Sequence, residues 1–153
     1  MNFKLISLGC KVNSYESNAI REMFLVNGYK EDINKPDVIV INTCSVTAVA
    51  DQKSRQIIRR EKRNNKNAIV VVMGCYSQKN SDYIAEKCDA DIIVGTSNRN
   101  KILTLINQFK SDNKKIILVD KDARHLPYES FGVFAMPEST RAYIKIEDGC
   151  NNF

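Results

Sequence analysis

Five short apolar segments alternate with segments of helical periodicity, and this alternation constrains the fold more than any other feature. The apolar segments cover residues 4–8, 37–42, 68–73, 91–94 and 116–119. Short, nearly continuous apolar strands are typical of parallel sheets that are covered on both faces, and strands alternating with helices indicate βαβ units. The sequence therefore predicts a five-stranded, doubly wound parallel α/β sheet, Rossmann- or flavodoxin-like, over residues 1–120.

The intervening helices are predicted from capping residues and helical spacing. Asn13, with Glu16 three residues later, is typical of a capping box, and Gly28 is expected to end that helix. A long polar helix with Val49 and Ile58 among its few buried candidates is expected next. The later predicted helices cover residues 47–64, residues 81–87 and a segment capped by Ser97 or Asn98.

The regular alternation stops after residue 120. Pro127, Gly132 and Pro137 punctuate residues 121–140, which are predicted to be a linker. Residues 141–147 alternate like a further strand, and the sequence stops soon afterwards. We expect residues 141–153 to begin a second domain, and the chain to be part of a longer protein.

The charge of the chain is compatible with an RNA partner. The formal charge is +5 and the pI about 8.9, which suits a polyanion, although a modest positive charge also keeps many proteins soluble. Seven cations of the long polar helix and its end can follow a phosphate backbone or form a solvated face. They are Lys53, Arg55, Arg59, Arg60, Lys62, Arg63 and Lys66. The sequence has neither a bilayer-spanning apolar run nor a secretory signal, so we expect a cytoplasmic protein without a membrane partner.

Three of the five cysteines occupy equivalent places in this pattern. Cys10, Cys44 and Cys75 each follow a predicted strand by one or two residues. The carboxyl ends of parallel strands open onto one edge of a sheet, where ligands bind, so the three thiols are expected to meet there. Helix N-termini at that edge favour negative charge and lower the pKa of a thiol. Three thiolates suit an iron–sulfur cluster and would leave one iron open to another ligand.

Other interpretations of the cysteines remain open. Any single free Cys is commonly a buried core residue, and Cys88 is expected to be one. A zinc site of three cysteines completed by His125 is a second possibility. A flavodoxin-like binding or signalling module is a third, but the sequence has neither a P-loop nor a Gly-x-Gly-x-x-Gly motif.

The segments around these cysteines resemble a known family, the radical S-adenosylmethionine methylthiotransferases. SLGCKVNSYES (residues 7–17) resembles the opening motif of that family, and NTCSVT (42–47) and GCY (74–76) resemble its second and third motifs. DQKSRQ (51–56) is similar to the segment after the second cysteine. IKIEDGCNNF (144–153) is similar to the run into the Cys-x-x-x-Cys-x-x-Cys motif of the family.

The resemblance implies a role for four cysteines. Cys10, Cys44 and Cys75 would hold an auxiliary [4Fe–4S] cluster. Cys150 would be the first ligand of a second [4Fe–4S] cluster, the one that binds S-adenosylmethionine. Because the chain stops before the next cysteine of that motif, we expect it to be inactive by itself. In the whole enzyme, a 5′-deoxyadenosyl radical would take hydrogen from C2 of an adenine, which then receives the methylthio group.

Within the family, KVNSYE (residues 11–16) looks most like the branch that modifies N6-threonylcarbamoyladenosine. The expected partner is therefore the anticodon stem-loop of a tRNA. The isopentenyladenosine branch and the ribosomal-protein branch are the alternatives.

Overall fold

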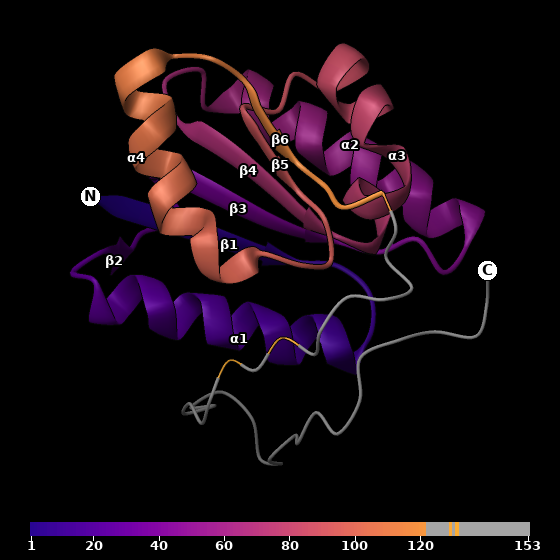
Figure 1. The fold of residues 1–153 in the computed structure, drawn as a ribbon, viewed down its shortest axis with the longest axis horizontal. Helices are drawn as coiled ribbons and strands as arrows, with labels where there is room; N and C mark the ends of the chain where they lie inside the picture. The colour runs from indigo at the N-terminus through magenta and orange to yellow at the C-terminus, as the bar shows by residue number, and fades with distance from the viewer. Residues whose placement is uncertain (122–128, 130, 132–153) are drawn as a thin grey trace.

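The computed structural model describes residues 1–121, 129 and 131, and it confirms the predicted α/β class. One parallel sheet has the strand order β2-β1-β3-β4-β5-β6, and its arrowheads point the same way in Figure 1. The strands are β1 (Asn2–Ser7), β2 (Lys30–Glu31), β3 (Val38–Thr43), β4 (Ile69–Gly74), β5 (Ile92–Val94) and β6 (Ile116–Leu118). The two-residue edge strand β2 was not predicted, because Lys-Glu has no apolar pattern and pairs only with the start of β1.

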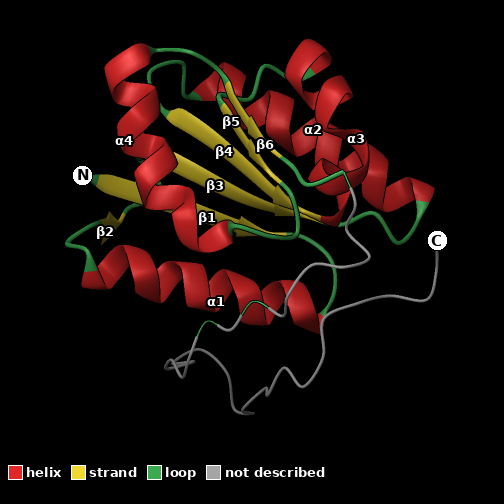
Figure 2. Ribbon diagram, viewed as in Figure 1, coloured by secondary structure: helices red, strands yellow, loops and turns green. Residues whose placement is uncertain are grey.

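Helices cover both faces of the sheet, as Figure 2 shows. They are α1 (Lys11–Val26), α2 (Ala48–Asn64), α3 (Cys75–Lys87) and α4 (Ile102–Asp112), with a 3-10 turn η1 (Arg99–Lys101) before α4. One core joins the sheet to α1 and α4 through residues such as Phe24 and Ile106. A second core joins the opposite face to α2 and α3 through Ile58 and Ile84. All six residues of β3 are buried, which explains why the central strands lack an alternating pattern.

The beginning of α1 differs from the prediction. Cys10 is the N-cap residue and α1 starts at Lys11, so Asn13 and Glu16 lie inside the helix and are buried. Their side chains do not form a capping box because they are directed at β3 instead, where Asn42 offers hydrogen-bond partners. The end of the helix is as predicted, since α1 stops at Val26, shortly before Gly28.

The helix after β4 begins six residues earlier than predicted. Gly74 has a φ of +100° and is followed directly by α3, so Cys75 is the first helical residue. Residues 75–80 lack apolar periodicity, and the helix is kinked at Asn80, which together hid this part of the helix from the sequence pattern.

Two other predictions about burial have opposite outcomes. Cys88 is buried in the core against α2 and α3, as expected. Val49 is exposed rather than buried, because α2 contacts the sheet chiefly through Ile58 in its second half. Within residues 1–121, no helix is long and apolar enough to cross a membrane. His125 and Cys150, and the predicted linker and second domain apart from residues 121, 129 and 131, lie outside the described residues.

Candidate metal centre

The strand order creates a switch point beside the first cysteine. After β1 the chain moves to the edge strand β2 and then returns to β3 on the other side of β1. Ligands of open parallel sheets bind at the carboxyl ends of strands where the order reverses in this way. Cys10 follows β1 and Cys44 follows β3, so both stand at the switch point, and Cys75 follows the next strand, β4.

The loops after β1 and β3 are in direct contact. Gly9 has a φ of +106°, and a Cβ placed on it would lie 2.5 Å from Cys44 Cβ and 2.7 Å from Cys44 Sγ. Only glycine accommodates both the positive φ and this close approach. Gly9 therefore permits Cys44 to lie directly against the residue that precedes Cys10.

Cys75 is electrostatically coupled to the other two thiols. Burial, and then the neighbouring Glu16, Cys44 and Cys10, raise the pKa of Cys75 to about 11, although Arg99 acts in the opposite direction. Thr43 of β3 is paired with Gly74 of β4, so Cys44 and Cys75 follow paired residues of neighbouring strands. Gly9 brings the residue before Cys10 against Cys44, and the three cysteines therefore stand at one edge of the sheet, as predicted. Although Cys75 is solvent-accessible, protein groups surround enough of the thiol to disfavour its charged form.

The expected lowering of thiol pKa at this edge is wrong for Cys75. The N-terminus of α3 favours a thiolate, but burial and the neighbouring thiols and carboxylate outweigh it. Without a bound metal, Cys75 therefore stays protonated at neutral pH, and a metal has to displace the proton. Cys10 is likewise exposed, whereas Cys44 is buried.

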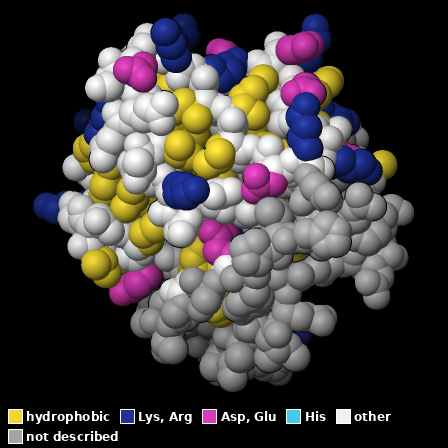
Figure 3. All heavy atoms as spheres, in the orientation of Figure 1, with side chains coloured by type: hydrophobic (Ala, Val, Ile, Leu, Met, Phe, Trp, Pro, Cys, Tyr) yellow, Lys and Arg dark blue, Asp and Glu magenta, His cyan; other side chains and the backbone are white. Residues whose placement is uncertain are grey.

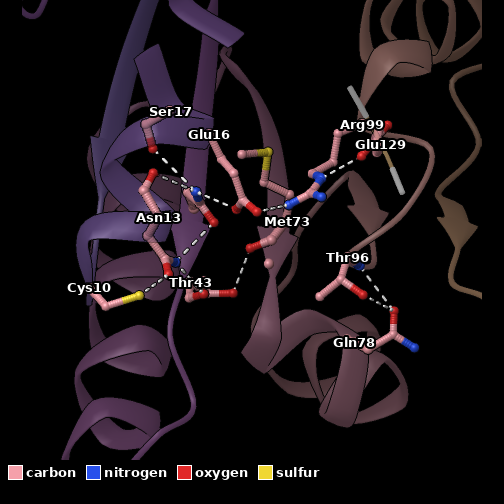
Figure 4. A network of polar contacts seen from close by, with 12 residues as sticks. Cys10, Asn13, Glu16, Ser17, Thr43, Met73, Gln78, Thr96, Arg99 and Glu129 are labelled. Carbon is pink, nitrogen blue, oxygen red and sulfur yellow. Dashed lines mark hydrogen bonds and ion pairs between the residues drawn. The ribbon is translucent and has the colours of Figure 1, made fainter. Parts of the chain in front are cut away.

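A network of side-chain amides connects the loop that carries Cys10 to the end of β3, as Figure 4 shows. Cys10 Sγ donates to Asn13 Oδ1 at 3.3 Å, and Asn13 Nδ2 donates to Thr43 O at 3.0 Å and to Asn42 Oδ1 at 3.2 Å. Asn42 Nδ2 donates to Asn13 O at 3.0 Å and to Ser17 Oγ at 3.2 Å. Paired amides thus attach the start of α1 to the end of β3 and orient Cys10.

A hydroxyl group of β3 connects the end of that strand to the end of β4 and to α3. Thr43 Oγ1 donates to Met73 O at 2.6 Å and accepts from the Ser77 backbone N–H at 3.3 Å. Ser54 Oγ donates to Cys44 O at 3.1 Å, which connects the cysteine loop to α2. These bonds are buried, so the positions of the three cysteines depend on rigid strand and helix ends rather than on exposed loops.

A buried arginine lies behind the amide network. Arg99, only 1% exposed, pairs with Glu16 Oε1 at 2.5 Å and with Glu129 Oε2 at 2.7 Å. Its guanidinium carbon also lies 5.2 Å from the Phe131 ring centroid. Burial by itself would lower the pKa of Arg99, but the charges of both glutamates outweigh it and raise the pKa.

Sequence reasoning did not identify Arg99 or Asn42 as parts of the site. Asn42 ends an otherwise apolar strand segment, and a polar residue at that position was the available signal. No comparable signal marks Arg99, because its partners Glu16 and Glu129 are far from it in the sequence.

The thiols are not arranged around a single ion. Among residues 1–121, 129 and 131, no group of three or more His, Cys, Asp or Glu side chains is placed to hold one metal ion. A polynuclear cluster makes a different demand, because each thiolate binds a separate iron. Three cysteines at three adjacent strand ends are a donor set of the kind that holds such a cluster.

Comparisons with known proteins agree with the cysteine motifs. Residues 2–95 match the family described as "Uncharacterized protein family UPF0004". Threonylcarbamoyladenosine tRNA methylthiotransferase MtaB of Bacillus subtilis (strain 168) is 44% identical over 149 residues, which are 96% of this chain and 33% of that protein. The enzyme of the same name from Aquifex aeolicus (strain VF5) is 34% identical over 96% of this chain and 36% of its own length.

A relative from another branch is also similar. The tRNA-2-methylthio-N(6)-dimethylallyladenosine synthase of Syntrophus aciditrophicus (strain SB) is 34% identical over 96% of this chain and 33% of its own length. The chain thus spans about a third of the length of these curated relatives. The matched segment includes Cys10, Cys44 and Cys75, and the chain belongs to the family UPF0004 and resembles the methylthiotransferases as the motifs predicted.

Proposed function

We propose that Cys10, Cys44 and Cys75 hold an auxiliary [4Fe–4S] cluster in an enzyme that adds a methylthio group to a tRNA base. The observation that carries the proposal is the position of three cysteines at the ends of three adjacent parallel strands, beside the switch point of the sheet. Ligand sites of open α/β sheets lie at this place, and thiolates are the usual ligands of iron–sulfur clusters.

The donor set fits a cluster that takes part in a reaction. Three protein ligands leave one of four irons without a protein ligand. When bound, such a cluster supplies an open iron that can hold the sulfur to be transferred. Cys10 and Cys75 are exposed, so the site is accessible from solvent for cluster assembly and for a substrate.

The residues around the thiols position them for this role. Asn13 accepts the hydrogen bond from Cys10 and so directs its sulfur. Gly9 keeps space for Cys44, and Ser54 holds the backbone carbonyl of Cys44 against α2. These groups bind and orient, while the cofactors provide the reactive chemistry.

We infer that the substrate is N6-threonylcarbamoyladenosine beside the anticodon, so that the partner is a tRNA anticodon stem-loop. Residues 11–16 support this branch, and so does the 44% identity to a threonylcarbamoyladenosine tRNA methylthiotransferase. The alternatives are the isopentenyladenosine and ribosomal-protein branches, and a relative from the first of these is 34% identical. A tRNA substrate would place the activity in the cytoplasm.

We assign Cys150 as the first ligand of a second [4Fe–4S] cluster, which would bind S-adenosylmethionine in the whole enzyme. Residues 151–153 contain no further cysteine, so this chain has an incomplete set of ligands for that cluster. We therefore expect the 153-residue chain to bind the auxiliary cluster but to be inactive by itself.

Anaerobic reconstitution of the 153-residue chain with ferrous iron and sulfide tests the cluster assignment. We expect about four irons and about four sulfides per chain, as one cubane requires, with the visible absorption of a cluster. Replacement of Cys10, Cys44 or Cys75 singly by Ala should lower the iron content or release the cluster. Cys88→Ala is the matched control and should retain it, since Cys88 is in the core.

Two outcomes would contradict the assignment. The first is zinc in place of iron. The second is iron that survives every single replacement, whether or not it is lost when all three cysteines are replaced together. Zinc binding would favour the other candidate, a flavodoxin-like binding module with a structural metal site. The substrate is tested separately by mass spectrometry of tRNA from cells that lack the full-length protein, where only the threonylcarbamoyl nucleoside should lose its methylthio group.

A further inference from the structure

The packing of α2 on α3 creates a basic surface that the proposed cluster site does not use. We call it the basic seam. It consists of Arg55, Arg59, Lys62, Arg63 and Lys66 on α2 and the α2–β4 loop, and of Tyr83 and Lys87 on α3, and the buried Tyr76 lies beside Arg55. The seam lies on the sheet face opposite α1 and α4. A pocket of about 450 Å³ opens at one end of it, lined by Arg59, Lys62, Arg63, Lys66, Lys87, Cys88 and Asp89.

The positive charge of this pocket is only partly neutralised. Lys62 is paired with both oxygens of Asp91, at 2.8 and 2.7 Å, and Asp89 lies 4.0 Å from Lys115. Among the described residues, no carboxylate forms an ion pair with Arg59, Arg63, Lys66 or Lys87. The face of the molecule seen in Figure 3 carries basic and acidic side chains in a mixture.

Stabilisation of helix ends does not account for so many cations. The pocket lies near the C-termini of α2 and α3, where cations offset the helix dipole. Each dipole is equivalent to only about half a negative charge, so two helix ends amount to roughly one. The two helix ends therefore offset less positive charge than the pocket carries on Arg59, Arg63, Lys66 and Lys87. The remaining positive charge is available to an external anion.

Arginines and tyrosines alternate along the seam between the pocket and the cysteines. Arg55 lies 5.9 Å from the ring centroids of both Tyr76 and Tyr83, and Arg59 lies 5.9 Å from that of Tyr83. Arg59 also donates to Tyr83 Oη at 2.9 Å. The Tyr83 side chain is 41% exposed, so an unpaired base can reach it. Exposed aromatic rings beside guanidinium groups are typical of surfaces that bind unpaired nucleic acid.

The seam leads directly to the candidate metal centre. Tyr76 follows Cys75 in the sequence, and α2 begins four residues after Cys44. From Ala48 to Lys62 the helix rises by about 21 Å at 1.5 Å per residue. That distance is a few nucleotides of RNA backbone, so one strand can contact both the pocket and the cysteine edge.

We propose that the basic seam binds the sugar–phosphate backbone of an RNA whose modified nucleotide is presented at the cysteine edge. Arg59, Arg63, Lys66 and Lys87 contact phosphates, and Tyr83 stacks on an unpaired base. The proposal rests on the proposed function, because it names the surface of this chain that the tRNA substrate contacts. It requires no bound cluster, since the seam residues are not ligands.

The test measures binding of a fluorescein-labelled anticodon stem-loop RNA to the 153-residue chain by fluorescence anisotropy over a series of salt concentrations. The seam variant replaces Arg63, Lys66 and Lys87 by Gln, which removes three exposed cations without touching the core. Each lost phosphate contact lowers the slope of log K against log salt by about 0.7–0.9. We expect the slope to fall by about 2 and the affinity by roughly ten- to hundredfold at about 0.1 M salt.

The matched control variant replaces Lys30, Lys35 and Lys101 by Gln, three exposed cations that lie outside the seam. It changes the net charge equally, and we expect its affinity and salt slope to remain close to those of the unmodified chain. In addition, Tyr83→Ala should weaken binding about tenfold, whereas Tyr83→Phe, which keeps the ring, should restore most of it. Circular dichroism confirms that each variant is folded.

Equal losses in the seam and control variants would overturn the proposal, because they would reflect net charge only. So would the absence of RNA binding by the unmodified chain. Iron content, measured on the same preparations, separates this result from the proposed function. If the chain holds iron and the seam variant binds RNA as tightly as the unmodified chain, only the RNA-binding inference is refuted. If the chain holds no iron and the seam variant alone binds RNA more weakly, only the cluster assignment is refuted.

Discussion

The buried Arg99 provides the most direct test of how the candidate site is supported. Its side chain is 1% exposed, and those of its partners Glu16 and Glu129 are 6% and 12% exposed. Arg99→Met keeps much of the buried volume but removes the charge. Both carboxylates then remain in a poorly solvated place without their cation.

The expected cost follows from this burial. Removal of one partner of a buried ion pair commonly destabilises a protein by about 3–5 kcal/mol, because the remaining charge is uncompensated. Glu16 keeps a weak contact with Asn42 Nδ2 at 3.5 Å, which favours the lower end of that range. We therefore expect Arg99→Met to lower the free energy of unfolding by about 3 kcal/mol, which corresponds to a Tm about 10 °C lower.

Urea unfolding followed by circular dichroism measures this free energy, and a double-mutant cycle isolates the ion pair. Glu16→Gln combined with Arg99→Met removes one of the two uncompensated charges, that of Glu16. The double variant should therefore be more stable than the sum of the single effects by at least about 1 kcal/mol. Arg21→Met is the matched control. Its ion pair with Glu31, at 3.2 Å, is partly exposed, so the control should lose no more than about 1 kcal/mol.

Two results would contradict the expected cost of the buried charges: a loss of stability in Arg99→Met no larger than that of the Arg21 control, or simply additive effects in the cycle. Either result would mean that the two carboxylates are adequately solvated without the arginine.

Three further predictions concern the surroundings of the thiols. Gly9→Ala should destabilise the chain by at least about 2 kcal/mol in thermal melts and lower its iron content, because the φ of +106° and the contact with Cys44 exclude a Cβ; unchanged stability would contradict the close approach. Asn42→Ala should cost about 2–4 kcal/mol, since four buried hydrogen bonds of the Asn42 side chain are lost; a loss below about 0.5 kcal/mol would show that water replaces them. Iodoacetamide should label Cys10 but not Cys88 in the native chain, as mass spectrometry can show, because Cys88 is buried and burial raises its pKa. Labelling of Cys88 should therefore stay slow as the pH rises through the ordinary thiol range, and equal rates for the two cysteines would contradict the buried position.

The fold class and the places of the three strand-end cysteines could be predicted from the pattern of residues along the chain. Apolar runs such as residues 68–73 can be read locally, because each strand of a parallel sheet buries its own side chains on both faces. Cys10, Cys44 and Cys75 follow such runs, so their meeting follows from topology.

The contacts that support the site could not be predicted in this way, because they form between segments that are distant in the sequence. Asn13 and Glu16 matched a local capping pattern, yet they bond across space to Asn42 and Arg99. The pKa of Cys75 likewise depends on burial and on charges from other segments, which outweigh the local effect of the helix N-terminus. Hydrogen bonds, ion pairs and desolvation act between groups that folding brings together, and their partners are therefore not visible in the order of residues along the chain.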